Sequence, residues 1–190
     1  MIENAVVLLR DELQAYINTK DASVAVIIDN IAMFETSNGD TPTNNIVLTL
    51  VNIEEESTLK NQAPLRRPIG TGALIENTLV YLNLYVLFTC NYSGKDYRLA
   101  LRRLSYIIQF LQSKTSFSTN SPAGAGVPDL ENDETENVRF TLELCNLTFE
   151  QINHLWGSLG GRQMPFAMYK LSMVASTQRA EVRAVTVITR

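Results

Sequence analysis

Two apolar blocks occupy the middle of the chain, and both have the two-residue period of β-strands. In Ile46–Asn52 both alternating sets of side chains are largely apolar, which predicts a strand covered on both faces. In Leu79–Thr89 one face is uniformly apolar and should meet the main core; its members are Val80, Leu82, Leu84, Val86 and Phe88. The carboxylates of Glu54–Glu56 follow the first block, where we expect them to stay solvated at the end of the strand.

Helical periodicity is clearest in Ile2–Asn18 and Lys95–Lys114, where apolar residues recur every three or four positions. Ser93 or Asp96 is the candidate N-cap of the second helix, and Lys114 suits its C-terminal end. Its buried stripe is expected to comprise Tyr97, Ala100, Leu101, Leu104, Ile107, Ile108 and Leu111.

A third, shorter helix is predicted over Phe149–Leu159. Asn146 or Thr148 is its candidate N-cap, and Gly160-Gly161 should end it.

The remaining strand signals are clustered rather than each followed by a helix. They cover Val24–Ile28, continued through Ile31–Phe34, and then Val138–Leu144, Pro165–Ser176 and Val182–Ile188. This order favours an α+β fold with a mixed or mostly antiparallel sheet. We expect the N-terminal helix and the long central helix to pack on that sheet.

Two segments have the composition of irregular structure. Asn61–Gly72 combines proline, arginine and glycine, which predicts a loop or an extended arm. Ser116–Glu136 is rich in serine, proline and glycine and ends in an acidic run, so we expect a long mobile loop. At 190 residues the chain has the length of one domain, here taken as residues 1–190.

Charge and cysteine content narrow the classes of function. The formal net charge is -4, which argues against a nucleic-acid partner because such proteins usually carry a basic stripe. Met1–Arg10 lacks the pattern of a signal peptide, so we expect synthesis in the cytoplasm. Cys90 and Cys145 lie in apolar runs and are expected to be buried thiols.

Candidate catalytic chemistry is sparse, and no cofactor or metal site is expected. The single histidine, His154, has no metal-ligand partners at suitable spacing and is expected to serve packing or to lie on the surface. Glu54–Glu56 should not converge on a cation, because adjacent strand residues point to opposite faces. Trp156 is open to two interpretations, a core residue or an interface anchor.

The arginines are the notable charged positions. Arg98 and Arg102 are four residues apart and share a helix face, so they form either a solvated surface or a contact between subunits. The second interpretation places the basic residues against the acidic loop of a neighbouring copy. The candidate interface residues are Arg66, Arg67, Arg98, Arg102, Arg103, Asp129, Glu131, Asp133 and Glu134.

Several segments together resemble a known family. One strand ends in Asn52-Ile53-Glu54-Glu55, and a second reads YLNLYVLFT from Tyr81 to Thr89. The last part reads LTFEQINHLWGSLGGRQMPFAMYKLSMV (Leu147–Val174), with Leu155-Trp156 before a glycine turn and Pro165 before a strand that carries Tyr169. This pattern resembles the cap, or tail-terminator, proteins of contractile injection systems of the antifeeding-prophage and Photorhabdus virulence-cassette type.

The resemblance implies a structural protein rather than an enzyme. It implies a ring, with six copies as the expected number, that ends tube and sheath polymerisation at the end distal to the baseplate. The implied partners are other copies of the chain and the sheath and inner-tube proteins. An alternative function is an adaptor or binding module for cargo loading or membrane attachment. The particle would be either released from the producing cell or anchored in it.

Overall fold

The computed structural model describes residues 1–33, 44–56, 65–66, 73–75, 80–92, 96–119, 138–175 and 183–185. Its helices are α1 (Ile2–Lys20), α2 (Tyr97–Ser113), α3 (Phe149–Ser158) and the 3-10 helix η1 (Ile31–Met33). Its strands are β1 (Val26–Ile28), β2 (Asn45–Glu55), β3 (Leu65–Arg66), β4 (Ala73–Ile75), β5 (Val80–Asn91), β6 (Ser116–Ser118), β7 (Arg139–Leu144), β8 (Phe166–Ala175) and β9 (Arg183–Val185).

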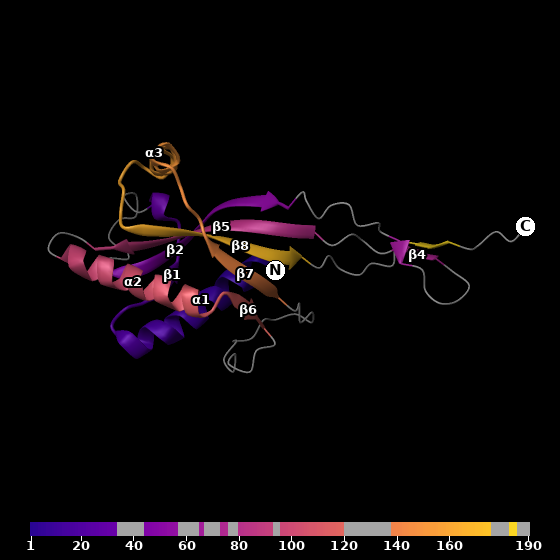
Figure 1. The fold of residues 1–190 in the computed structure, drawn as a ribbon, viewed down its shortest axis with the longest axis horizontal. Coiled ribbons are helices and arrows are strands. Elements are labelled where there is room, and N and C mark those ends of the chain that lie inside the picture. The colour runs from indigo at the N-terminus through magenta and orange to yellow at the C-terminus, as the bar shows by residue number, and fades with distance from the viewer. Residues whose placement is uncertain are drawn as a thin grey trace, which may run out of the picture.

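Six strands form the main sheet in the order β1-β2-β5-β8-β7-β6. Strand β1 pairs with β2 in parallel, and the other neighbouring pairs are antiparallel. Helices α1 and α2 lie on one face of the sheet and α3 lies on the other (Figure 1). The predicted α+β fold, with a mostly antiparallel sheet and two helices packed on it, is confirmed.

The main core lies between the sheet and the two long helices. Leu84, Val86 and Phe88 of β5 are fully buried in it, on the strand face that the alternation predicted. Helix α1 contributes Leu9 and Leu13, which are also fully buried. Burying a side chain of this size stabilises the fold by about 1.5–3 kcal/mol, so this layer fixes the positions of both helices.

A smaller apolar cluster covers part of the opposite face. It contains Val47, Leu87, Met168 and Ile31, with partly buried side chains of α3 packed against it. The first half of β2 is therefore covered on both faces, as predicted. After an irregularity in register between Leu50 and Asn52, the rest of β2 is exposed.

The structure corrects three boundaries expected from the sequence. Ile31–Met33 is a 3-10 helix rather than a continuation of the strand before it. Ser116–Ser118, at the start of the expected loop, is strand β6, and its buried Phe117 stacks on Phe140 at 5.1 Å between ring centroids. The expected loop Asn61–Gly72 contains the short strand β3.

A second, small sheet has the order β3-β4-β9. Its strands belong to the chain segments that follow β2, precede β5 and follow β8. Since β2, β5 and β8 are neighbours in the main sheet, the small sheet repeats their order. It lies beyond the end of the main sheet where β2 and β8 finish and β5 begins (Figure 1).

Candidate assembly interface

The first two turns of α2 carry an exposed mixture of cationic and apolar side chains. Tyr97 is 56% exposed and Leu101 is 44% exposed. Arg98 and Arg102 are exposed beside them. These pairs are four residues apart, so the four side chains form one continuous patch on the outside of the helix. We call Tyr97, Arg98, Leu101 and Arg102 the α2 surface.

This patch differs from the sequence expectation in its apolar part. Ala100, Ile107 and Leu111 of the predicted stripe are buried, but Tyr97 and Leu101 are exposed, and the helix also buries Arg103 and Phe110, which the prediction did not include. The stripe is rotated because an arginine, which apolar periodicity does not count, takes a buried position. The exposed apolar side chains of the α2 surface were therefore missed, and the arrangement of the helix in the fold was needed to find them.

Helix α2 also begins with little negative charge. Its first turn contains no acidic residue, and the exposed Asp96 at the N-cap position makes no side-chain capping hydrogen bond. The amino end of a helix has a partial positive charge, to which Arg98 adds a full one. In the part of the chain that the structure describes, neither Arg98 nor Arg102 has an ion-pair partner. The α2 surface is thus a positively charged patch open to an anionic group.

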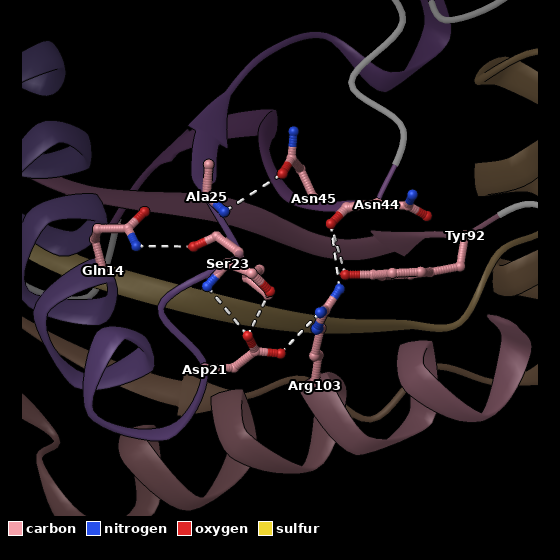
Figure 2. A network of polar contacts seen from close by, with 9 residues as sticks. Gln14, Asp21, Ser23, Ala25, Asn44, Asn45, Tyr92 and Arg103 are labelled. Carbon is pink, nitrogen blue, oxygen red and sulfur yellow. Dashed lines mark hydrogen bonds and ion pairs between the residues drawn. The ribbon is translucent and has the colours of Figure 1, made fainter.

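Arg103, by contrast, is not available at this surface. It is only 6% exposed, and its guanidinium forms an ion pair with Asp21 at 2.8 Å. It also donates a hydrogen bond to the carbonyl of Asn44 at 3.2 Å and lies over the ring of Tyr92 at 4.6 Å (Figure 2). Arg103 was a candidate interface residue, but it is buried and its contacts lie within the same chain.

The Arg103 contacts join helix α2 to the ends of three other elements. Asp21 follows α1, Tyr92 follows β5, and Asn44, with a φ of 67°, precedes β2. The Tyr92 hydroxyl donates to the same Asn44 carbonyl at 2.7 Å (Figure 2). Helix α2 is therefore fixed against the sheet close to the turns that carry the α2 surface.

The acid–base behaviour of Asp21 follows from this geometry. The Ser23 hydroxyl donates to the carboxylate at 2.6 Å. That hydroxyl, followed by the Arg103 guanidinium and the Ser23 amide, lowers the pKa of Asp21 to about 2. Each of these groups favours the ionised carboxylate, which therefore stays charged over the neutral and mildly acidic range.

Gln14 connects α1 to the first strand. Its side chain accepts from the amide of Val26 at 2.6 Å and donates to the carbonyl of Val24 at 3.0 Å. Asn45 accepts from the amide of Ala25 at 3.3 Å (Figure 2). These bonds satisfy backbone groups where β1 begins and hold that strand in place.

The carboxylates at the end of β2 are engaged in separate hydrogen bonds. Glu54 accepts from Asn52 at 3.1 Å and from the Tyr85 hydroxyl at 2.9 Å, which raises the pKa of Tyr85. Glu56 accepts from the buried Asn83 at 2.8 Å. Glu54 and Glu55 are exposed, as predicted for a solvated strand end. No cluster of potential metal ligands occurs among the residues that the structure describes.

Helix α3 has the cap that its sequence suggested. Thr148, rather than Asn146, forms a capping box with Gln151, in which each side chain accepts from the other residue's backbone amide. Both Gly160 and Gly161, just after the helix, have positive φ values. The helix thus begins and ends at residues whose chemistry suits those positions.

The family-like residues near α3 are mainly structural. Trp156 is 4% exposed and packs edge-on against Phe166 at 5.4 Å, which favours the core interpretation. Leu155 packs partly buried against the same cluster. His154 is exposed on the outside of α3, 3.8 Å from Glu150.

The family-like residues Pro165, Tyr169 and Tyr81 lie in or next to the main sheet, and they also make structural contacts. The Pro165 carbonyl accepts from the amide of Cys90 at 3.1 Å, immediately before β8. Tyr169 is buried and packs edge-on against Phe88 at 5.8 Å. Tyr81, on β5, is half-buried.

Burial also determines the state of the cysteines. Both are free; Cys90 is buried and Cys145 is half-buried. Burial raises the pKa of the Cys90 thiol to about 12, and it raises the pKa of Cys145 as well. These thiols are therefore poor nucleophiles at neutral pH.

A small cavity of about 40 Å³ is lined in part by Ile31, Trp156 and Met164. Its lining contains no histidine, cysteine or carboxylate that could act as an acid, base or nucleophile. Among the described helices, none has the length and apolar content needed to cross a membrane.

The structure does not describe the side chains of the other candidate interface residues. The backbone of Arg66 lies in β3. Arg67, Asp129, Glu131, Asp133 and Glu134 lie outside the described residues.

The described residues form an α+β domain with a positively charged patch on one helix. Residues 6–190 match the Pvc16 N-terminal domain family, which is nearly the whole chain. The chain therefore belongs to this family. No curated protein matches it.

Two solved structures share the fold. One is the sheath/tube terminator of an extracellular contractile injection system (PVC) in its extended state; it is 15% identical with a TM-score of 0.59, over 97% of this chain and 61% of that one. The other is the anti-feeding prophage cap, described as a tube-terminating cap; it is 15% identical with a TM-score of 0.61, over 96% of this chain and 58% of that one. The chain spans about three-fifths of the length of these terminators.

Proposed function

We propose that this chain is the terminator domain of a contractile injection particle, where it ends the polymerisation of tube and sheath at the end distal to the baseplate. One observation carries the proposal. The chain belongs to the Pvc16 N-terminal domain family, and its fold matches two terminators over 96% or more of its length. The role needs binding surfaces rather than turnover. The described residues fit that requirement, since they offer charged and apolar surface but no catalytic constellation.

The proposed assembly is a ring of several copies, with six as the expected number. A ring closes when two different patches of the same chain meet from one copy to the next. The α2 surface supplies one exposed patch, and the basic Arg66–Arg67 pair and the acidic residues of 129–136 are candidates for others.

The small sheet supports a contact through strand edges. Its order β3-β4-β9 leaves β3 and β9 each with one edge that no other described strand pairs. Unpaired strand edges carry free backbone donors and acceptors, which an extended segment of a partner can complete. We expect this sheet to contact the tube or sheath protein of the same particle.

Electron microscopy of particles from a strain that lacks this chain tests the function. Sheath–tube assemblies that are absent, unstable or of scattered length would support the terminator. Particles of normal, uniform length with an intact distal cap would contradict it and would favour an adaptor that loads cargo or attaches the particle to a membrane. A strain that carries the Asn146→Ala variant, a change at an exposed position without a described contact, is the matched control.

A further inference from the structure

The α2 surface has a fitting partner within the same amino-acid sequence. We infer that the α2 surface of one copy binds the acidic segment 129–136 of a second copy. This contact would join each copy of the proposed ring to the next. The inference therefore rests on the proposed function, and it names the partner of the α2 surface.

The first argument is the chemistry of the α2 surface. Arg98 and Arg102 are exposed and have no ion-pair partner among the described residues, while Arg103 beside them is neutralised by Asp21. Asp96 supplies one negative charge at the start of the helix, so the patch keeps an excess of positive charge. The exposed Tyr97 and Leu101 add an apolar area. A partner segment should therefore carry several carboxylates and at least one apolar side chain.

The second argument is the composition of the acidic segment. It reads DLENDETE, with carboxylates at Asp129, Glu131, Asp133, Glu134 and Glu136. No lysine or arginine occurs between Lys114 and Arg139, so its charge is not balanced locally. Leu130 stands among the carboxylates as an apolar side chain that matches Tyr97 and Leu101.

The third argument is reach, which favours binding between copies. Arg98 lies about 22 Å along α2 from the end of the helix at Ser113, since a helix rises 1.5 Å per residue. Val138, where the described chain resumes, accepts from the amide of Thr119, just after β6. Strand β6 lies at the opposite end of α2 from its first turn (Figure 1).

The number of residues before Val138 limits how far each carboxylate can be from it. A fully extended chain spans about 3.5 Å per residue, so this limit is roughly 7 Å for Glu136 and roughly 14 Å for Glu134, but roughly 31 Å for Asp129. The five carboxylates therefore cannot all lie along the α2 surface of their own copy. A neighbouring copy has no such restriction, and a contact between two different patches is the kind that closes a ring.

Charge reversal in the purified chain tests the inference through sedimentation velocity. Variant A, R98E/R102E, should lose self-association by at least about tenfold, because like charges then face each other. Variant B, D129K/E131K/D133K/E134K, turns four of the five carboxylates of the segment into lysines and should lose it to a similar degree. An equimolar mixture of A and B should regain assembly, since each variant keeps one half of the original contact and the reversed halves are again complementary.

Net charge is controlled on the same helix. R98Q/R102Q and Q109E/Q112E both lower the net charge by two, and Gln109 and Gln112 are exposed near the other end of α2. Only R98Q/R102Q should weaken association. Circular dichroism of every variant should match the original chain, which separates loss of binding from loss of folding.

Three results would overturn the contact. The first is a wild-type chain that stays monomeric at its highest soluble concentration. The second is an equal loss of association in R98Q/R102Q and Q109E/Q112E. The third is a mixture of variants A and B that fails to reassemble. Each leaves the terminator proposal in place, since that proposal is judged by the particle lengths of the deletion strain.

Discussion

Replacing Arg103 by methionine should destabilise the fold, whereas the same change at the adjacent Arg102 should not. Arg103 is buried with its guanidinium between Asp21, Asn44 and Tyr92. Arg102 is exposed and has no described partner. The two positions differ by one residue and share the same chemistry, so the pair isolates the effect of burial.

The expected size follows from the contacts that methionine cannot make. A hydrogen bond from a charged group contributes about 1.5–3 kcal/mol to stability. The bond from Arg103 to the Asn44 carbonyl is long, at 3.2 Å, so we take the lower value of that range. The stacking of the guanidinium on Tyr92 adds about 0.5–1 kcal/mol. Asp21 is left out of the sum, because water can reach its carboxylate and replace the ion pair. The loss of unfolding free energy should therefore be about 2 kcal/mol.

Urea denaturation, followed by circular dichroism and by the fluorescence of the single tryptophan Trp156, measures this loss. For a chain of this length, about 2 kcal/mol also lowers Tm by roughly 4–8 °C. The stability of Arg103→Lys should lie between that of the original chain and that of Arg103→Met, since one ammonium group cannot contact both Asp21 and Asn44. A methionine variant at Arg103 that is as stable as the one at Arg102, within about 0.5 kcal/mol, would refute the structural role of Arg103.

Three further predictions concern other parts of the chain. Thr148→Ala should cost about 1 kcal/mol in urea denaturation by removing the capping box, while Asn146→Ala should cost nothing measurable; equal effects would contradict the assigned cap. Because the folded pKa of Asp21 is lowered to about 2 from an ordinary 3.8, its stabilising contribution is complete above pH 3.8 and is lost as the pH falls toward 2. The stability advantage of the original chain over Asp21→Asn should therefore shrink over this range, and a constant difference would argue against the ion pair. Iodoacetamide at pH 8 should leave Cys90 unmodified in the folded chain and alkylate it after unfolding, as read by mass spectrometry; modification of folded Cys90 at the rate of an unfolded thiol would show that it is not buried.

The sequence predicted the parts of the fold that depend on local chemistry and periodicity. The alternation in β5 identified its core face, because the set that contains Leu84, Val86 and Phe88 is uniformly apolar whereas the other set contains Asn83. The capping box at Thr148 and the glycines after α3 identified both ends of that helix, because those residues have few alternative uses there. The resemblance of several segments to terminator proteins agrees with the family that residues 6–190 match.

The missed features depend on tertiary contacts. Apolar periodicity cannot show that Arg103 is buried, because its burial depends on Asp21, Asn44 and Tyr92, which come from distant parts of the sequence. The rotation of α2 that exposes Leu101 follows from the same contacts. Strand β6 was missed because only Phe117 in it is large and apolar, and its pairing with β7 gives it order.

The position of the chain on the assembled particle tests the central claim most directly. Gold-labelled antibody against the chain, viewed by electron microscopy on intact particles, should mark one end of each particle, opposite the baseplate. Label along the sheath, at the baseplate or on free protein alone would contradict the assignment of this chain as the terminator.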